Sequence, residues 1–292
     1  MLTSVVIPNF NGENLLKSNL PFVLALGADE VIVVDDGSAD DSIEIIRNFK
    51  FQISNFKLIE NKKNLGFAQS VNKGVTAARG DVVVLLNTDV KPAKDLLRYV
   101  IPHFSNSKVF GVSFAESQWS WSRGFWQYGY VQHEPGLRTN KVHETFWVSG
   151  GSGAFRKSIW DKLEGFDEIY APFYWEDVDL CYRALRRGYK LLWEPKAQVE
   201  HAHEATISKY HARSEINFVQ ERNQLIFIWK NITSSELIVE HWKNLFLRLL
   251  NSPGYVKIVL AALLRINRIS AARRIENKEK IISDEDIFER FK

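Results

Sequence analysis

The sequence of 292 residues contains a single cysteine, Cys181, and a single methionine. One cysteine excludes an internal disulfide framework and is typical of a protein in a reducing compartment. No apolar run reaches the roughly 18 residues that a membrane-spanning helix needs. The first residues also lack the basic segment and apolar core of a signal peptide. We therefore expect a cytoplasmic protein without a transmembrane helix.

Residues 1–100 alternate apolar runs that are typical of buried strands with segments of helical spacing. Strands are expected at residues 4–8, 30–35, 57–60 and 82–86, and helices at residues 15–26, 41–49 and 67–78. Continuous apolar strands separated by helices predict a mostly parallel sheet that is covered on both faces. The sequence therefore predicts an α/β fold, whose ligands are expected at the carboxyl ends of the strands.

Two common nucleotide-binding motifs are missing from these strand ends. No Gly-x-Gly-x-x-Gly follows the first strand, which argues against a dinucleotide-dependent oxidoreductase. No Gly-x-x-x-x-Gly-Lys-Ser/Thr sequence occurs either, which argues against a P-loop nucleotidase. The polar residues at the expected strand ends are instead Asn9, Asp35, Asp36, Asn87, Thr88 and Asp89. Carboxylates without a phosphate-binding glycine loop favour a site in which a divalent cation bridges the protein and a substrate diphosphate.

A second group of acids follows a cluster of four aromatic residues and a proline at residues 170–175. The acids are Glu176, Asp177 and Asp179, and a segment of helical spacing runs from them to residue 190. The helix dipole stabilises the charged form of acids in the first turn. An ionised carboxylate beside an aromatic pocket has the properties of a general base, whereas the alternative is ordinary capping of a helix. These residues alone leave both interpretations open.

Short motifs in a fixed order carry a resemblance to a known family. They lie at residues 5–13, 31–38, 64–68, 72–74, 80–89, 150–156, 165–167, 175–183 and 199–201. The chain resembles the family 2 glycosyltransferases, which have a GT-A fold, and within them the rhamnosyltransferase-like branch that builds bacterial surface polysaccharides. The resemblance implies inverting transfer of a sugar from a nucleoside diphosphate to a saccharide acceptor. dTDP-rhamnose is one candidate donor, and UDP- and GDP-sugars are alternatives.

The resemblance assigns the strand-end residues to the donor and to a divalent cation, Mn²⁺ or Mg²⁺. Asp89 matches the last aspartate of the family's Asp-x-Asp motif, and it is expected to bind the metal together with His201. Asn87 stands where that motif has its first aspartate, so one carboxylate is missing from the family pattern. His203 is a weaker candidate for the metal. The residues expected to bind the nucleotide sugar are Pro8, Asn9, Asp35, Asp36, Asn64, Gly66, Asn87 and Thr88, with Asp35 on the base.

The resemblance assigns the acids at residues 176–179 to the acceptor side. Asp177 matches the catalytic base, which takes the proton of the acceptor hydroxyl, and Glu176 is expected to support it. Asp179 is expected to be structural through a contact with Arg183. The residues expected to contact the acceptor are Gly150, Gly151 and Trp175.

This assignment divides the chain into a GT-A catalytic domain at residues 1–207 and a helical region at residues 208–292. The domain comprises a nucleotide-binding half at residues 1–100 and an acceptor-binding half at residues 101–207. One alternative is a sugar nucleotidyltransferase, whose glycine- and lysine-rich N-terminal signature is absent from residues 9–12. Another is a non-catalytic carbohydrate-binding protein, which the joint presence of Asp89, Asp177 and His201 argues against.

The C-terminal region carries the positive charge of the chain. Between Glu240 and Glu276 the sequence has seven basic residues and no acidic residue. An apolar and basic segment at residues 241–275 is suited to an anionic membrane surface, and the alternative is a helix packed on the domain. Binding to nucleic acid is not expected, because the segment is rich in leucine and poor in interleaved aromatics. The acceptor predicted for such a protein is a saccharide linked to polyprenyl diphosphate at the inner face of the cell membrane.

Overall fold

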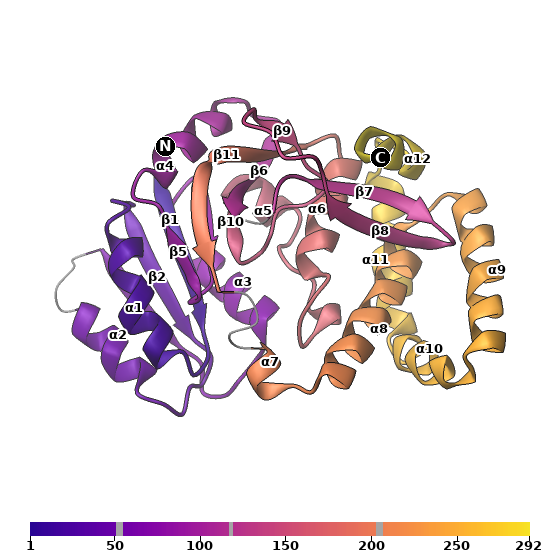
Figure 1. Ribbon diagram of the computed structural model, residues 1–292, viewed down its shortest axis with the longest axis horizontal. Coiled ribbons are helices and arrows are strands. Elements are labelled where there is room, and N and C mark those ends of the chain that lie inside the picture. Colours follow the sequence, from indigo (N-terminus) through magenta and orange to yellow (C-terminus); the bar gives the residue numbers. More distant parts are fainter. Residues whose placement is uncertain (51–54, 117–118, 203–206) are drawn as a thin grey trace.

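The computed structural model describes residues 1–50, 55–116, 119–202 and 207–292 (Figure 1). Within these residues, nine strands form one sheet in the order β3–β2–β1–β4–β10–β6–β11–β5, with β9 paired to β11. Its strands are β1 (Thr3–Asn9), β2 (Glu30–Asp35), β3 (Phe56–Glu60), β4 (Val82–Leu86), β5 (Val90–Pro92), β6 (Val109–Glu116), β9 (His143–Glu144), β10 (Ser152–Arg156) and β11 (Lys190–His201). A separate antiparallel hairpin consists of β7 (Ser122–Gln127) and β8 (Tyr130–Pro135).

The four strands expected from the sequence form the parallel part of the sheet. β1 lies between β2 and β4 and is parallel to both, and β2 is parallel to β3. β10 then runs antiparallel between β4 and β6, and β11 is parallel to β6. The prediction of an α/β fold with a mostly parallel sheet is confirmed.

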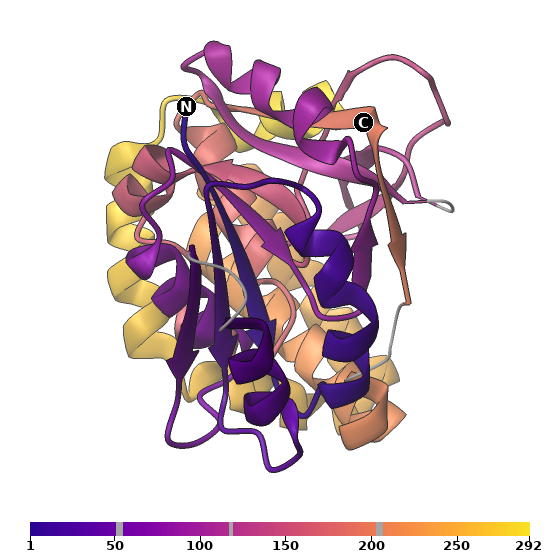
Figure 2. The same ribbon diagram turned by 90° about the vertical axis from the view of Figure 1, so that its left-hand side faces the viewer.

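The sheet is buried on both faces, as its continuous apolar strands require. Val5 and Val6 are adjacent in β1, so their side chains point to opposite faces. Val5 packs in one buried cluster with Leu16 of α1 (Glu13–Leu24), and Val6 packs in another with Val71 of α3 (Phe67–Ala77). Other helices of this half are α2 (Ser42–Lys50) and α4 (Leu96–Val100), which the 3-10 helix η1 (Ile101–Ser105) follows. Figure 2 shows this half from its own side, with the C-terminal helices behind it.

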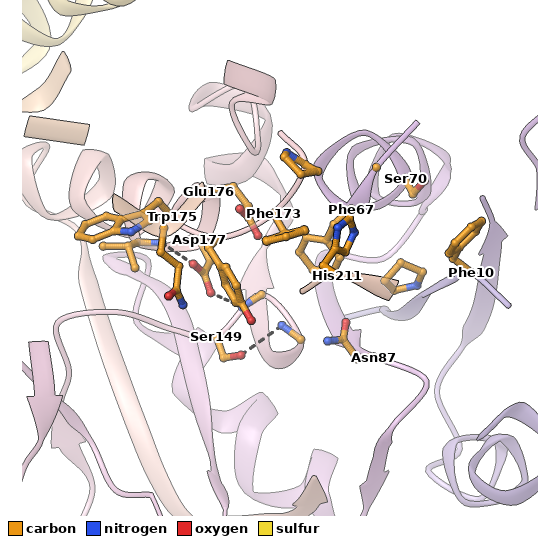
Figure 3. A pocket seen from close by; sticks show the side chains of 18 of the residues that line it. Phe10, Phe67, Ser70, Asn87, Ser149, Phe173, Trp175, Glu176, Asp177 and His211 are labelled. Carbon is orange, nitrogen blue, oxygen red and sulfur yellow. Dashed lines mark hydrogen bonds between the residues drawn. The ribbon is translucent and has the colours of Figure 1, made fainter. Parts of the chain in front are cut away.

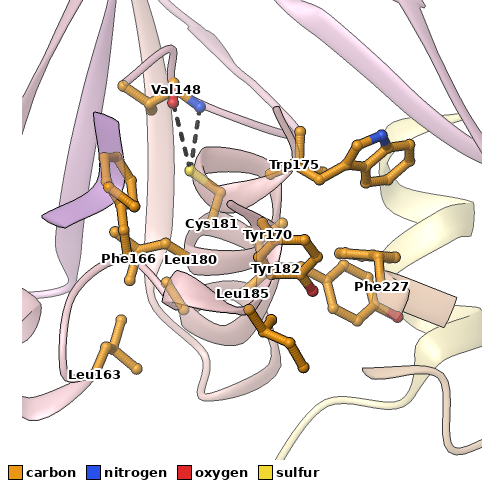
Figure 4. Packing of buried hydrophobic residues seen from close by; sticks show 14 of the residues in the cluster. Val148, Leu163, Phe166, Tyr170, Trp175, Leu180, Cys181, Tyr182, Leu185 and Phe227 are labelled. Carbon is orange, nitrogen blue, oxygen red and sulfur yellow. Dashed lines mark hydrogen bonds between the residues drawn. The ribbon is translucent and has the colours of Figure 1, made fainter. Parts of the chain in front are cut away.

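α6 (Glu176–Arg186) lies in the second half of the chain, after α5 (Lys157–Lys162) and the 3-10 helix η2 (Glu168–Tyr170). Figure 4 shows the apolar side chains packed around it, where Tyr182 contacts Phe227 of α8 (Arg213–Asn231) edge to face. α8 is buried around most of its C-terminal half, from Leu225 onward. The sheet and α8 therefore share one hydrophobic core.

The helices after α8 complete the C-terminal region. They are α9 (Ser235–Asn251), the 3-10 helix η3 (Pro253–Tyr255), α10 (Val256–Leu263), α11 (Ile266–Glu279) and α12 (Asp284–Phe291), and the short α7 (Ile207–Tyr210) precedes α8. α10 and α11 pack against α8, and α12 packs against β7. None of the helices in the described residues is long and apolar enough to cross a membrane. The division of the chain at residues 207 and 208 stays a prediction.

Candidate active site

A cavity of about 710 Å³ lies beyond the carboxyl ends of β1 and β4. Its walls come from the loops after these strands, from the turn before α6 and from α8. In Figure 3, Trp175 and Asp177 lie toward one end, Phe10 lies at the other, and Asn87 lies between them. Every predicted site residue except Asp35 lines this cavity, namely Pro8, Asn9, Asp36, Asn64, Gly66, Asn87, Thr88, Asp89, Gly150, Gly151, Trp175, Glu176, Asp177 and His201.

Asp35 lies behind the wall of the cavity rather than on it. Its side chain is fully buried, and its two oxygens accept hydrogen bonds from the Asn9 amide at 2.8 Å and from the Ser38 backbone and hydroxyl at 2.9 and 2.7 Å. These bonds fix the loop that presents Asn9. Oδ1 of Asp35 accepts one of these hydrogen bonds and Oδ2 accepts two. The predicted contact between Asp35 and a base stays a prediction.

Asp36 lines the cavity and also holds the loop at residues 64–66. Its oxygens accept hydrogen bonds from the backbone N–H groups of Leu65 and Gly66, both at 2.9 Å, and from the Asn61 amide at 2.8 Å. Gly66 has a φ of 90°, which a side chain would strain. Asp36 thus sets the shape of this part of the wall.

Asn87 and Gly151 bring β4 against the loop before β10. The Asn87 backbone N–H donates to the Gly151 carbonyl at 2.8 Å. A Cβ atom at Gly151 would lie only 2.4 Å from Nδ2 of Asn87, so only glycine allows this approach. Oδ1 of Asn87 and Oδ1 of Asn9 are buried in the cavity wall and accept no hydrogen bond from the described residues. Unsatisfied buried oxygens of this kind mark a place for a donor or a cation from a ligand.

Asp89 and His201 meet although 112 positions separate them in the sequence. Nε2 of His201 lies 3.3 Å from Oδ1 of Asp89, and Nδ1 lies 3.0 Å from Oε1 of Glu116. Burial lowers the pKa of His201, but its hydrogen bonds to Asp89 and Glu116 outweigh burial and raise the pKa to about 9. The metal-free protein thus holds a protonated imidazole between two carboxylates.

These residues fit a divalent cation. Oδ1 of Asp89 is buried and accepts no well-aligned hydrogen bond within the described residues, and it faces an imidazole nitrogen. Carboxylate oxygen and imidazole are suitable ligands for Mn²⁺, and a carboxylate on the second ring nitrogen orients such a histidine. No group of three or more His, Cys, Asp or Glu side chains in the described residues is arranged to hold a metal ion by itself. A cation here would need further oxygen ligands from a substrate or water. His203 lies outside the described residues.

Glu176 and Asp177 begin α6 and face the same cavity. Burial raises the pKa of Glu176 well above its usual value, and the neighbouring Asp177 raises it further. Burial also raises the pKa of Asp177, although hydrogen bonds from the backbone N–H groups of Gly150 at 3.1 Å and Val178 at 2.8 Å oppose it. The sequence led us to expect that the helix dipole favours the ionised form of these acids, and burial acts in the opposite direction. Asp177 has the backbone donors of Gly150 and Val178, whereas the charge of Asp177 adds to the effect of burial on the pKa of Glu176.

An unfavourable backbone turn presents these two acids. Tyr174 and Trp175 both have positive φ, 70° and 78°, which costs about 1–3 kcal/mol for each bulky residue. The buried amide of Asn223 on α8 holds the turn, because it donates to the carbonyls of Tyr170, Phe173 and Tyr174 at 2.6, 3.0 and 2.8 Å. Asn223 is a positioning residue that sequence patterns did not reveal.

Asp179 points to the other side of α6 and has a structural environment. It accepts hydrogen bonds from Arg183 at 2.7 Å, Lys230 at 2.9 Å, Asn231 at 2.7 Å and Tyr170 at 2.8 Å. Burial alone raises the pKa of Asp179, but the charges of Lys230 and Arg183 outweigh it and hold the pKa below its usual value. The predicted contact with Arg183 is confirmed.

The end of the cavity near Asp177 contains residues beyond the three that were predicted to contact the acceptor. Trp147 stacks on His133 with 4.8 Å between the ring centroids, and His133 meets Trp175 edge to face at 6.2 Å. Gln224 of α8 also lines this part and donates its amide to the Val131 carbonyl at 2.8 Å. Trp175 was predicted from the sequence, whereas the weak periodicity of residues 116–147 did not distinguish Trp147 from the other tryptophans of that segment.

Acidic side chains predominate among the charged residues lining the cavity. Asp36, Asp89, Glu176, Asp177 and Glu221 line it, whereas no lysine or arginine does so among the described residues. The carboxylate of Glu221 is paired with Arg248. His201, whose pKa is raised, also lines the cavity, but it lies between the carboxylates of Asp89 and Glu116. A ligand with a negative charge therefore needs more positive charge than these side chains supply.

Comparison with known proteins identifies the family. The sequence model described as glycosyl transferase family 2 matches residues 4–163. The chain belongs to this family. The pre-mycofactocin glycosyltransferase of Mycobacterium tuberculosis is 30% identical over 223 residues, which cover 72% of this chain and 44% of the relative. This family 2 chain spans less than half the length of the first curated relatives that it matches.

Solved structures show the fold of this family 2 chain. The structure of GalNAc-T7 with UDP, GalNAc and Mn²⁺ has a TM-score of 0.66 and 16% identity, and it covers 87% of this chain and 57% of that one. The structure of S. aureus TarS with UDP-GlcNAc has a TM-score of 0.61 and 14% identity over 100% of this chain and 89% of that one. The GT-A fold that the sequence motifs predict is confirmed. The finer assignment to a rhamnosyltransferase-like branch stays a prediction.

Proposed function

We propose that this protein transfers a sugar from a nucleoside diphosphate to a hydroxyl of a saccharide acceptor, with inversion at the anomeric carbon. The observation that supports this most is the position of Asp177, a half-buried carboxylate of raised pKa in the same cavity as Asn9, Asn87 and Thr88. A pKa closer to neutrality makes a carboxylate a more effective general base. Solved structures of the same fold that contain UDP or UDP-GlcNAc support a nucleotide-sugar donor.

In the proposed reaction, Asp177 accepts the proton of the acceptor hydroxyl as that oxygen bonds to the anomeric carbon of the donor. The bond from this carbon to the diphosphate oxygen breaks on the opposite side, and its electron pair leaves with the nucleoside diphosphate. One displacement inverts the configuration without a covalent link to the protein. Glu176, which keeps its proton, donates a hydrogen bond to the acceptor and holds it beside Asp177.

The charge of the cavity supports a metal-dependent reaction. The acidic lining repels a diphosphate, and no lysine or arginine among the described lining residues offsets that repulsion. Asp89 and His201 would hold Mn²⁺ or Mg²⁺, with Glu116 orienting the imidazole. The cation supplies positive charge that stabilises the departing diphosphate. Mn²⁺ in the GalNAc-T7 structure supports this choice.

The acceptor side favours an uncharged sugar ring. Trp147, Trp175 and His133 present ring faces and edges, and Gln224 presents an amide. Aromatic faces suit the apolar C–H face of a pyranose, and an amide suits its hydroxyls. We further propose dTDP-rhamnose as the donor, an acceptor linked to polyprenyl diphosphate in bacterial surface polysaccharide synthesis, and a cytoplasmic location. The sequence motifs and the basic C-terminal region support these finer assignments.

A thermal-shift screen with dTDP, UDP and GDP tests the donor and the metal together. A specific diphosphate at about 100 times its Kd stabilises the protein by about 2.7 kcal/mol. We expect one base to give the largest shift, and we expect Mn²⁺ to increase that shift. The variants Asp89→Asn and His201→Ala should lose the increase due to Mn²⁺.

A matched control is His103→Ala, because His103 also pairs with a buried glutamate, Glu194 at 2.7 Å, but lies outside the cavity. It should retain the shift due to Mn²⁺. If a chelator leaves the thermal shift caused by the nucleoside diphosphate unchanged, the proposed metal dependence is wrong. If no nucleoside diphosphate causes a thermal shift, the proposed class of donor is wrong.

A further inference from the structure

The C-terminal helices expose an unusual share of the apolar surface. Ten of the twenty large hydrophobic side chains that are exposed in the described part of the chain lie between residues 239 and 266. They are Val239, Trp242, Phe246, Leu247, Leu250, Val256, Leu260, Leu263, Leu264 and Ile266. Most belong to α9 and α10, which lie at the opposite end of the molecule from α1 and α2 (Figure 1). Exposed apolar side chains gathered on two consecutive helices indicate an interaction site.

The exposed residues of α9 form a stripe with helical spacing. Val239, Trp242, Phe246 and Leu250 follow one another at intervals of three or four residues, so they lie on one side of the helix. Leu245 and His241 occupy the opposite side and are buried against the rest of the protein. Trp242 also stacks on Trp229 of α8 at 5.7 Å, and Phe246 and Leu250 are each 61% exposed.

α10 repeats this arrangement directly after η3. Val256, Leu260 and Leu264 are four residues apart, and they are 44%, 55% and 86% exposed. Ala262 is fully buried on the inner side, where α10 packs against α8. The two consecutive helices, α9 and α10, each turn an apolar side outward; we call these two sides the C-terminal apolar face.

The charge around this face determines which partner it suits. Lys243 and Lys257 are exposed beside the two stripes, and no acid occurs between Glu240 and Glu276. The carboxylate of Glu240 is turned inward, where it accepts hydrogen bonds from Nε1 of Trp126 at 2.8 Å and from the Gly129 backbone at 3.1 Å. A second copy of the chain on the same face would bring like charges together, whereas an anionic surface is complementary.

We propose that the C-terminal apolar face binds peripherally to the surface of a membrane that contains anionic lipids. Trp242, Phe246 and Leu250 enter the boundary between head groups and acyl chains, and Lys243 and Lys257 contact the head groups. Apolar burial and attraction to anionic lipid together give the binding energy of such interfacial helices. The binding itself does not depend on the proposed glycosyl transfer.

The position of α8 connects this face to the proposed function. α8 packs against α10 on one side and lines the acceptor end of the cavity with Gln220 and Gln224. If the proposed function holds, an acceptor carried by a lipid would reach the cavity from the membrane that α10 contacts. This consequence rests on the proposed transfer reaction.

Vesicle flotation tests the proposal. The purified protein should float with vesicles of phosphatidylcholine and phosphatidylglycerol at low salt, and it should float much less with phosphatidylcholine alone or at high salt. The double variant Phe246→Ser/Leu250→Ser should abolish flotation, because both side chains are exposed and their removal leaves the core intact. The double variant Lys243→Glu/Lys257→Glu should abolish the preference for phosphatidylglycerol.

Two matched controls lie away from the face. Leu137→Ser removes a side chain that is 87% exposed, and Lys17→Glu reverses an exposed charge on α1. Both should float like the unmodified protein. Wild-type protein that fails to float, or serine variants that float normally, would overturn the proposal. A dimer in solution that Phe246→Ser/Leu250→Ser converts to a monomer, without vesicle binding, would assign the face to a second copy instead.

The thermal shift with nucleoside diphosphates separates this proposal from the proposed function. The variants of the C-terminal apolar face lie outside the cavity, so they should keep the nucleotide shift of the wild type. Flotation without a thermal shift from any nucleoside diphosphate would support membrane binding and contradict the proposed nucleotide-sugar donor. A thermal shift without flotation would contradict membrane binding and leave the proposed donor unaffected.

Discussion

Two acids in the first turn of α6, Asp177 and Asp179, have pKa values that are shifted in opposite directions. Asp177 faces the cavity, where no lysine or arginine of the described residues lines the wall, and it has a raised pKa. Asp179, two residues later, faces the core, where Lys230 and Arg183 lower its pKa. Both acids share the same helix dipole, so the dipole does not explain the difference. The residues packed around each carboxylate decide whether it is suited to accept a proton in the cavity or to stabilise the core through ion pairs.

The largest effect is expected for Asp177→Asn. The amide cannot accept the proton of the acceptor, so kcat should fall by about 10²–10⁴-fold, the usual contribution of a general base. Stability should stay the same or rise near neutral pH, because the variant no longer buries a charge. Turnover with the best donor of the nucleotide screen and unfolding in urea measure the two quantities. If nucleotide binding falls as much as turnover, Asp177 is a binding residue and not the base.

Asp179→Asn should mainly lower the stability of the protein, in contrast to Asp177→Asn, which should mainly lower turnover. It leaves Lys230 and Arg183 buried without their carboxylate, which should cost about 3–5 kcal/mol in urea unfolding. The folded-state pKa of Asp179 is lowered, so its stabilisation is present above the unfolded pKa of about 3.9 and is lost as pH falls below it. The variant should therefore show a weaker loss of stability in acid than the wild type.

The control for this substitution is Asp161→Asn. Asp161 pairs with Lys157 at 2.7 Å, but its side chain is 52% exposed. An exposed pair contributes about 0–1 kcal/mol, so this variant should unfold almost like the wild type. Equal losses in the two variants would contradict the structural role of Asp179.

Asn223→Ala should lower both stability and kcat, each to an intermediate extent. It removes the Asn223 donor from three backbone carbonyls before α6, of which that of Tyr170 keeps only a long bond from Arg222 at 3.5 Å, so stability should fall by about 2 kcal/mol. The turn at Tyr174 and Trp175 should relax and misplace Asp177, which lowers kcat more than nucleotide binding. Asn244→Ala, which removes one amide donor to the Glu240 carbonyl on α9, should leave kcat unchanged. A normal kcat in Asn223→Ala would show that the turn keeps its shape without this amide.

Glu176→Gln should have the smallest effect near neutral pH. The proposed mechanism uses Glu176 as a neutral donor, and glutamine preserves a neutral donor of similar size. Burial and the charge of Asp177 raise the folded-state pKa of Glu176, so the wild type loses stability as pH rises from the unfolded pKa of about 4.3 up through the folded value, whereas the variant does not. Urea unfolding at several pH values should therefore show a gain for the variant that grows as the pH rises. A large loss of turnover at neutral pH would show that the negative charge of Glu176 is used.

The sequence predicted the parallel sheet because apolar strands and helices alternate in a local pattern. It also predicted, through the family motifs, that Asp89 and His201 belong to one site, and the structure places their nearest atoms 3.3 Å apart. It did not reveal that both oxygens of Asp35 are engaged by Asn9 and Ser38. Asn223 was also hidden, because its three bonds join α8 to a segment about 50 residues earlier. Contacts of this kind leave no periodic signal in the chain.

The sequence by itself determined the fold, the family and the set of polar residues at the strand ends, since these follow from local patterns and from motifs in order. Only the tertiary structure decided how the acids of α6 divide their roles. Desolvation and neighbouring charges control the pKa of a carboxylate, and both depend on which helices pack beside it. Lys230 and Asn231 of α8 reach Asp179 and do not reach Asp177, and this packing separates a structural acid from the proposed base.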